Sequence, residues 1–313
     1  MNTFEIVIKV IPIIIAIILG YFLARINFLK DSMIDAFKKV IVNVTLPAGL
    51  FIAFIKIRFQ IEYTLIILSV FTMCVLIVFI GKLIVKIFRI KSPYLPFLIT
   101  GFEAGMMGYA LFTAVYGADA ATDVAVVDIG HIIFVFLVFV PMAVNINNRE
   151  KGVSNIKASL LIAIKSPVIW SILLGLIGSL SGVWAYQDTK AFMTVENIFT
   201  LASAPTAFLI CLVIGSGLKL SKGNVTLVIL TAVSKVIITL LFAFIVVQTV
   251  FIPLGISSRI ITAFYAMCCL PAPFILPIYM NRSCVEDVNY VSNTLSVASI
   301  IGVICFSVVV LLS

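Results

Sequence analysis

The segment TGFEAGMMGYALFTAVYG, residues 100–117, places the carboxylate of Glu103 among glycines and methionines in an otherwise apolar stretch. A charged side chain near the centre of a bilayer costs at least ~2.5 kcal/mol on insertion scales. Chains that keep such a residue usually use it to bind a substrate or an ion, or to transfer protons. Glu103 is therefore the first candidate for a chemical role.

Three further ionisable residues lie in apolar stretches. Asp128 and His131 are one helical turn apart, so they can share a helix face and exchange a proton. A buried histidine that is simply bonded to a neighbouring carboxylate fits the same spacing. Lys235, midway along another apolar stretch, either pairs with Glu103 or extends its ammonium group toward the membrane surface.

The sequence lacks the patterns of common catalytic and metal sites. It contains one histidine and no G-x-S-x-G, H-E-x-x-H or paired catalytic aspartate motif, which argues against an enzyme. Asp128 and His131 lack a third ligand for a metal. We predict no metal and no organic cofactor, with H⁺ or Na⁺ as the possible coupling ion. The six cysteines show no metal-ligand spacing and are consistent with small apolar filler: Cys74, Cys211, Cys268, Cys269, Cys284 and Cys305.

The composition defines the elements that must position these residues. Of 313 residues, 63% are hydrophobic and 11% charged, and the mean hydropathy of +1.28 is far outside the range of soluble proteins. The chain is predicted to be an all-α integral membrane protein in contact with the lipid bilayer. A span needs roughly 20 apolar residues, and ten stretches qualify: 4–23, 36–55, 63–88, 93–117, 124–144, 160–180, 198–218, 224–250, 257–280 and 290–312.

The basic residues predict the orientation of these spans. If the N-terminus lies outside, fifteen of the 21 Lys and Arg residues fall on inner loops and four on outer loops. Because cytoplasmic loops retain Lys and Arg, this bias predicts a multi-pass protein of the plasma membrane with both termini outside. The positive charges are scattered over short loops, so no nucleic-acid partner is expected.

The chain divides into two sets of five spans. The polar segment NINNREKGVSNIKAS, residues 145–159, follows the fifth span. We predict a first repeat over 1–145, a cytoplasmic connecting loop over 146–159 and a second repeat over 160–313. Since five is odd, the second repeat starts from the opposite side of the membrane, as in transporters with inverted repeats. The fourth span is rich in glycine, and the ninth carries Pro271, Pro273 and Pro277.

Two interrupted helices at matching positions predict a binding site. Each interruption leaves backbone N–H and C=O groups that hydrocarbon cannot satisfy, and half-helix N-termini favour an anion. A second interpretation is that Gly101, Gly105 and Gly108 only allow close helix packing. We expect the substrate site to be lined by Asn43, Glu103, Gly105, Met106, Pro271, Ala272, Pro273 and Phe274.

The order of these motifs resembles the auxin efflux carrier family of secondary transporters over the full length of the chain. Members show a second span close to N-x-x-L-P, a fourth close to N-x-G-x-x-G-x-P that ends in Y-G, a fifth that opens with D-x-G-N or D-x-G-Q, and prolines in the ninth. The matching residues here are Asn43, Leu46 and Pro47; Glu103, Gly105, Gly108, Tyr116 and Gly117; Asp128, Gly130 and His131; and Pro271, Pro273 and Pro277.

Three residues depart from the family pattern. Glu103 stands where most members have Asn, Ala110 where they have Pro, and His131 where they have Asn or Gln. The first departure bears on coupling, because a carboxylate can titrate and an amide cannot. The second suggests that glycine flexibility, and not a proline, interrupts the fourth helix.

The resemblance implies ten transmembrane helices with crossed fourth and ninth helices, in an architecture similar to the sodium–bile-acid symporters. Spans one, two, six and seven would form a scaffold, with a possible homodimer through it, and the other spans a moving transport domain. Family substrates are small organic acids, and this chain resembles bacterial members, so we expect a dicarboxylate or an amino-acid-like acid.

Coupling is expected to involve Glu103, Asp128, His131 and Lys235. A protonated Glu103 could donate a hydrogen bond to an anion that its ionised form would repel, so we favour proton coupling with alternating access of the elevator type. A Na⁺-coupled carrier and a membrane sensor that binds without transporting are the alternatives.

Overall fold

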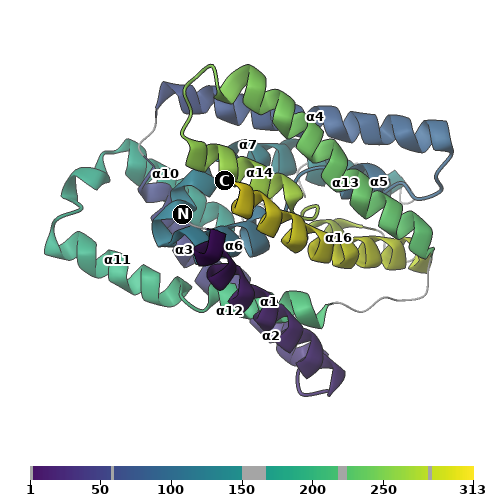
Figure 1. The fold of residues 1–313 in the computed structure, drawn as a ribbon, viewed down its shortest axis with the longest axis horizontal. Helices are drawn as coiled ribbons and strands as arrows, with labels where there is room; N and C mark the ends of the chain where they lie inside the picture. Colours follow the sequence, from purple (N-terminus) through teal and green to yellow (C-terminus); the bar gives the residue numbers. More distant parts are fainter. Residues whose placement is uncertain (1–2, 58–59, 150–166, 218–223, 281–283) are drawn as a thin grey trace. The chain divides into compact units, whose positions relative to one another are not determined.

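The computed structural model of the chain describes residues 3–57, 60–149, 167–217, 224–280 and 284–313. Within these ranges the regular secondary structure is helical, with no β-strand (Figure 1). Shorter apolar helices are formed by Ile14–Arg25, Pro167–Leu180 and Ser258–Cys269. Among the described residues, six helical segments are long and apolar enough to cross a membrane: Ser32–Ile55, Ile61–Phe88, Ala118–Ile146, Lys190–Ser216, Val225–Phe251 and Val285–Leu312.

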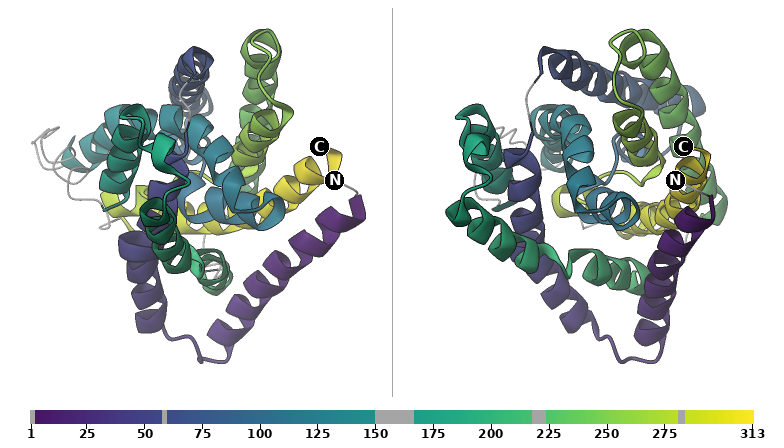
Figure 2. Two further views of the ribbon diagram at one scale, coloured as in Figure 1. Left: turned by 90° about the vertical axis from the view of Figure 1, so that its left-hand side faces the viewer. Right: turned by 60° about the vertical axis from the view of Figure 1, so that its left-hand side comes forward.

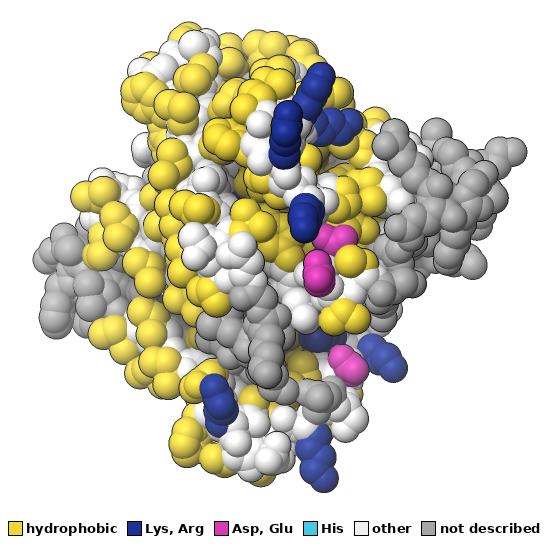
Figure 3. Space-filling model, turned by 90° about the vertical axis from the view of Figure 1, so that its right-hand side faces the viewer, with side chains coloured by type: hydrophobic (Ala, Val, Ile, Leu, Met, Phe, Trp, Pro, Cys, Tyr) yellow, Lys and Arg dark blue, Asp and Glu magenta, His cyan; other side chains and the backbone are white. Residues whose placement is uncertain are grey.

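Hydrophobic side chains are exposed on the surface as well as buried in the interior. Large hydrophobic side chains are exposed along α1 (Thr3–Arg25), α4 (Ile61–Phe88) and α13 (Val225–Val246). Apolar side chains cover much of the face shown in Figure 3, where Lys and Arg are confined to a few places. Such a surface suits contact with lipid, which confirms the prediction of an integral membrane protein. The ten-span count, the inverted repeat and the boundaries of the two repeats remain predictions, and residues 150–159 of the predicted connecting loop lie outside the described residues.

The helices cluster into two compact units. The first comprises the described parts of residues 1–63, 105–126 and 162–218. Figure 2 shows α1 and α2 diverging from the short connection between them. α1 packs along α12, and α3 packs on α10 and α11. Gly20 and Gly215 lie at the α1 and α12 contact, where a Cβ atom on either would overlap the backbone of the facing helix. The further helices of this unit are α2 (Asp31–Val40), η1 (Ile41–Thr45), α3 (Leu46–Ile55), α6 (Tyr109–Tyr116), η3 (Ala118–Ala120), α10 (Pro167–Leu180), η5 (Val183–Tyr186), α11 (Lys190–Ser203) and α12 (Thr206–Ser216).

The second unit comprises the described parts of residues 64–104, 127–161 and 219–313. In this unit α13 packs on α14 and α16, and α14 also packs on α16 (Figure 1). α7 (Ala121–Phe134) begins in the first unit and continues into the second at Val127. The further helices are α5 (Leu95–Leu98), η4 (Val135–Phe139), α8 (Val140–Arg149), η6 (Val247–Phe251), α14 (Ser258–Cys269), α15 (Leu276–Tyr279) and α16 (Val285–Leu312).

The composition of the units follows part of what the family resemblance implies. The helices of predicted spans one, two, six and seven all belong to the first unit. The helices of spans three, eight, nine and ten belong to the second unit, apart from the first three residues of α4. The fourth and fifth spans are divided between the units, which the resemblance did not imply.

The interruptions predicted in the fourth and ninth spans are present. In the fourth, α5 ends at Leu98, residues 99–103 are not helical, and the chain resumes with the π-helical turn η2 (Ala104–Gly108). In the ninth, α14 ends at Cys269, and residues 270–275 precede the short α15. Prolines interrupt the ninth span because they lack an N–H group, whereas the fourth is interrupted at a glycine.

Candidate functional site

Glu103 joins the two interruptions through its backbone and its side chain. Its N–H group donates a hydrogen bond to the Pro271 carbonyl oxygen at 2.8 Å. Its Oε2 atom accepts a hydrogen bond from the Phe274 N–H group at 2.6 Å. The residue is 8% exposed, so its carboxylate is held in a largely dry environment. Hydrogen bonds from backbone N–H groups to a carboxylate are among the stronger ones in proteins.

The Phe274 N–H group that bonds to the Glu103 side chain would form its hydrogen bond within the helix if the ninth span were continuous. In an uninterrupted α-helix the Phe274 N–H group would donate to the Leu270 carbonyl, four residues earlier. Pro271 and Pro273 interrupt that helix, and the two ends of this hydrogen bond separate. The N–H end is bonded by Glu103, and the Leu270 carbonyl oxygen accepts a hydrogen bond from Lys235 Nζ.

Lys235 is fully buried at 0% exposure, on the side of α13 that contacts α14 and α16. Its Nζ atom also donates to the Cys268 carbonyl oxygen at 2.8 Å, to which the Thr239 hydroxyl donates at 2.7 Å. These carbonyls end α14, where the helix leaves acceptors without internal donors. The interpretation of Lys235 as a side chain that extends to the membrane surface is therefore wrong, because its ammonium group satisfies the end of a broken helix.

His131 holds the other interruption in place. Its Nδ1 lies 3.1 Å from Asp128 Oδ1, and its Nε2 lies 3.3 Å from the Phe102 backbone nitrogen. The Phe102 N–H group can only donate, so this network assigns the proton of a neutral imidazole to Nδ1. The Phe102 and His131 rings also stack, with centroids 4.1 Å apart. The predicted contact between Asp128 and His131 is present, and their part in proton transfer remains a proposal.

Gly101 is required twice in this arrangement. Its φ of +70° lies in the left-handed region that side chains rarely adopt. A Cβ atom there would lie 2.9 Å from His131 Nε2 and 3.3 Å from Pro273 Cδ. The backbone of the fourth span thus contacts both His131 and the ninth span at a point where only glycine fits.

Replacement of Gly101 by alanine is expected to lower the free energy of unfolding by about 2 to 4 kcal/mol. The left-handed backbone costs about 1 to 2 kcal/mol with a Cβ atom, and the contact with His131 and Pro273 adds a similar amount. Chemical unfolding in mixed micelles measures the change. Gly182→Ala is the matched control, since Gly182 has φ +75° and open space around its Cβ position. Equal losses in the two variants would show that the packing against His131 contributes nothing.

The remaining residues predicted to bind substrate divide between the units. Pro271, Ala272 and Pro273 are buried, and Phe274 is half-buried, in the second unit. Gly105 and Met106 belong to η2, in the part assigned to the first unit, and the Met106 side chain lies outside the described residues.

Asn43, also in the first unit, is exposed, and its Nδ2 donates to the Lys39 carbonyl at 2.7 Å. It lines a mostly apolar cavity of about 530 Å³ together with Pro47, Trp170 and Phe199. The prediction that Asn43 faces the substrate site therefore stays untested.

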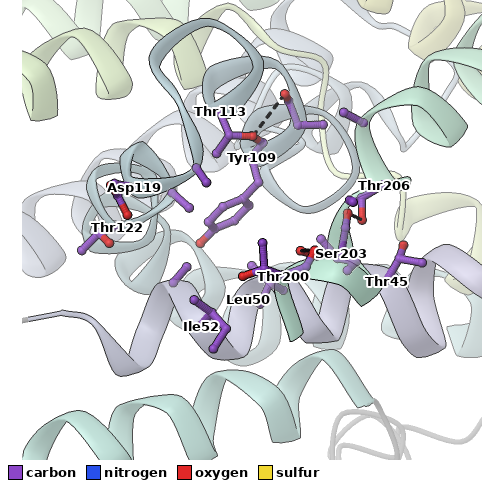
Figure 4. Close-up of a pocket in the computed structure, with 18 of the residues that line it drawn as sticks. Thr45, Leu50, Ile52, Tyr109, Thr113, Asp119, Thr122, Thr200, Ser203 and Thr206 are labelled. Carbon is purple, nitrogen blue, oxygen red and sulfur yellow. Dashed lines mark hydrogen bonds between the residues drawn. The ribbon is translucent and has the colours of Figure 1, made fainter. Parts of the chain in front are cut away.

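A different cavity, of about 400 Å³, lies within the first unit (Figure 4). It is lined by residues of η1 and α3, of α6, η3 and the start of α7, and of α11 and α12. Figure 4 shows the Tyr109 ring extending between the segment that carries Thr113 and the helix that carries Leu50. None of the residues predicted to bind substrate lines this cavity. Its polar and charged lining residues are Thr45, Lys56, Tyr109, Thr113, Asp119, Thr122, Glu196, Asn197, Thr200, Ser203 and Thr206.

The fold and the interrupted helices define a class of protein. A chain of apolar helices in which buried ionisable side chains satisfy two broken helices is typical of membrane transporters. The chain belongs to a family described as membrane transport protein, whose model matches residues 5–312. This match confirms the resemblance to the auxin efflux carrier family. The protein is therefore a multi-pass membrane protein of a transporter family, and not of an enzyme family.

Curated relatives agree with this class. The chain is 28% identical over 185 residues to a protein named "Uncharacterized transporter YfdV" in Escherichia coli strain K12, and equally to the proteins of that name in Escherichia coli O157:H7 and Shigella flexneri. The alignment covers 55% of this chain and 58% of each relative. The chain thus matches little more than half the length of these relatives.

Proposed function

We propose that the protein is a secondary active transporter that moves a small organic anion across the plasma membrane, coupled to protons, by an elevator-type alternating-access mechanism. The substrate is a dicarboxylate or an amino-acid-like acid. One observation carries the proposal: the buried carboxylate of Glu103 accepts a hydrogen bond from the Phe274 N–H group of the other interrupted helix. Substrate binding at this point must involve the protonation of Glu103 or the loss of that bond.

The chemistry of Glu103 couples the two events. While ionised, it occupies the Phe274 N–H group and repels a second carboxylate. Once protonated, it gains an O–H donor that can bond to the carboxylate of a substrate. A proton and an anion then bind together more tightly than either alone, which is the thermodynamic condition for symport. In this proposal His131 and Asp128 pass protons toward the interruption of the fourth span, and Lys235 stabilises the interruption of the ninth.

Counterflow in proteoliposomes tests the proposal. Vesicles loaded with unlabelled malate, malonate or an amino acid should accumulate the labelled form transiently, because a carrier exchanges solute across the membrane. A sensor that binds without transporting gives no uptake, and a channel gives no transient accumulation. Repeating the assay with an imposed Na⁺ gradient in place of a pH gradient tests the alternative of a Na⁺-coupled carrier.

The proposal includes the orientation predicted from the basic residues, with both termini outside. A cysteine introduced at Asp119 should react with a membrane-impermeant maleimide added to intact cells, and one at Ser154 should react only after the cells are opened. Asp119 lies in η3, and Ser154 lies outside the described residues. The reverse pattern would contradict the orientation. A homodimer through the scaffold helices, predicted spans one, two, six and seven, is proposed from the family resemblance alone.

A further inference from the structure

The C-terminal end of α4, in the second unit, carries a group of four cationic side chains: Lys82, Lys86, Arg89 and Lys91. All four are exposed, and none forms an ion pair with another described residue. Residues 63–102 contain no aspartate or glutamate, so this part of the chain has no carboxylate to neutralise them. Figure 3 shows a group of Lys and Arg side chains beside hydrophobic ones. Like charges one helical turn apart repel each other, so an anion bound between them would be favourable.

Acidic residues of another helix limit where such an anion can bind. Asp287, in the first turn of α16, accepts a hydrogen bond from the Ser92 hydroxyl at 2.6 Å. Its negative charge is therefore held beside the residue that follows Lys91, and the exposed Glu286 lies in the same turn of α16. An anion would be repelled there, which confines the candidate site to the other three cations.

An apolar stripe on α4 leads to these cations. Leu76, Phe79 and Leu83 are three and four positions apart, so they share one helix face, and they are 48 to 55% exposed. The opposite face carries Gly81, where a Cβ atom would lie 2.6 Å from the backbone of α5. That face packs on α5, which leaves the stripe free to contact lipid. Lys82 Nζ lies 5.0 Å from the centroid of the Phe79 ring, so the stripe and the cations meet.

The length of α4 places its last turns at the polar boundary of a bilayer. The helix has 28 residues. This corresponds to ~42 Å at 1.5 Å per residue, whereas the hydrocarbon core of a bilayer is ~30 Å thick. The stripe thus lies at the depth of acyl chains and the cations at the depth of phosphate groups. Clusters of basic residues at the end of a membrane-spanning helix attract anionic lipids.

Arg89 occupies a backbone position that glycine would fill more favourably. Its φ of +50° lies in the left-handed region. The Ile90 N–H group donates to the Val85 carbonyl at 3.1 Å, which is the characteristic hydrogen bond of a Schellman motif. The residue at this point of the motif is usually glycine, because a Cβ atom is strained there. A strained residue at such a position indicates a functional reason, and here it adds a cation to the end of the helix that carries Lys82 and Lys86.

We propose that this end of α4 binds an anionic phospholipid, with its phosphate between Lys82, Lys86 and Arg89 and an acyl chain along Leu76 and Phe79. A phosphate accepts charge-assisted hydrogen bonds from ammonium and guanidinium groups. Phosphatidylcholine carries an additional positive charge, which the three cations repel. The site shares no residue with the interruptions of the fourth and ninth spans or with the 400 Å³ cavity, and it does not depend on the transport function.

Quenching of a single tryptophan by brominated lipids tests the site in the full-length protein. The two native tryptophans, Trp170 and Trp184, belong to the first unit and are replaced by phenylalanine. Phe79→Trp then reports the lipid at the stripe, in vesicles of dioleoylphosphatidylcholine and dioleoylphosphatidylglycerol with either lipid brominated. We expect phosphatidylglycerol to bind there at least tenfold more tightly than phosphatidylcholine, since each cation near a bilayer surface contributes about fivefold.

Phe244→Trp is the matched control for the reporter. Phe244 is 54% exposed on α13 in the same unit, against 55% for Phe79, and residues 236–258 contain no Lys or Arg. At this position the two lipids should bind equally, within about twofold. An equal preference for phosphatidylglycerol at both positions would show that the net charge of the protein enriches this lipid everywhere, and would overturn the site.

Substitution of the cations assigns the phosphate position. Lys82→Gln and Lys86→Gln should each lower the preference for phosphatidylglycerol about three- to fivefold, and the triple variant with Arg89→Gly should lower it to about one. Lys39→Gln removes the same charge from the exposed side of α2 in the first unit and should leave the preference unchanged. A preference that persists in the triple variant would overturn the site.

Arg89→Gly separates lipid binding from a structural role. Glycine relieves the left-handed strain, so the midpoint of thermal unfolding in neutral detergent should rise by about 1 to 2 °C. The preference for phosphatidylglycerol should fall about three- to fivefold in the same variant. A lower midpoint with an unchanged lipid preference would show that Arg89 stabilises the helix end and does not bind the lipid.

Discussion

Glu103→Gln is expected to abolish proton-driven accumulation of substrate and to leave substrate exchange nearly unchanged. Glutamine keeps the shape of glutamate and an oxygen that can accept the hydrogen bond from the Phe274 N–H group. This bond is 2.6 Å long in the unaltered protein. It cannot release a proton. For one proton per substrate, each unit of pH gradient supports about tenfold accumulation. We expect this ratio to fall to about one in the variant, measured in proteoliposomes with an imposed pH gradient, while counterflow continues.

Two further variants test whether the loss of accumulation is specific to the carboxylate of Glu103. Glu286→Gln removes a carboxylate from the exposed first turn of α16 in the same unit, and it should keep the full accumulation ratio. Glu103→Ala leaves the Phe274 N–H group without its acceptor, so it should lose both exchange and stability. If Glu103→Gln responds to the pH gradient like the unaltered protein, Glu103 has a structural or Na⁺-binding role instead of a proton-coupling one.

The interruptions themselves can be predicted from the sequence, because the responsible residues act locally. Pro271 and Pro273 remove two N–H donors wherever the chain folds, and glycine tolerates the backbone of the fourth span at Gly101. The contact between Asp128 and His131 follows from helical spacing alone. The need of Glu103 for a partner follows from its place in an apolar stretch.

The partners of the freed backbone groups cannot be predicted in this way. Glu103 and Phe274 are 171 positions apart, and no periodicity in either segment specifies their contact. Lys235 is bonded to carbonyls of Cys268 and Leu270, which carry no sequence signal because every residue has one. A lysine in an apolar stretch indicates that a partner exists, and only the packing of α13 on α14 identifies it.

The cavity of the first unit cannot be predicted from the sequence, for a different reason. Its lining is mostly small and hydroxyl-bearing residues, which transmembrane helices use widely for packing. In the sequence, Lys56 is only one of the four basic residues of the predicted outer loops, because no local pattern links it to Asp119 and Glu196, which pair with it in the structure.

Lys235→Met should lower the free energy of unfolding by about 2 to 3 kcal/mol. Methionine fills a similar volume without a donor, so the Leu270 carbonyl loses its charged hydrogen-bond partner, while Thr239 still bonds Cys268. Chemical unfolding in mixed micelles gives the value. Lys82→Met, on the exposed part of α4, is the matched control, with an expected change below about 0.5 kcal/mol.

Lys235 and Glu103 satisfy the two ends of one opened hydrogen bond, so the losses of stability in Lys235→Met and Glu103→Ala should not add. Once one end is lost, the interruption rearranges and the second substitution costs less. Fully additive losses in the double variant would show that the two residues stabilise the interruption independently. If Lys235→Met alone loses no more stability than Lys82→Met, Lys235 does not stabilise the interruption of the ninth helix.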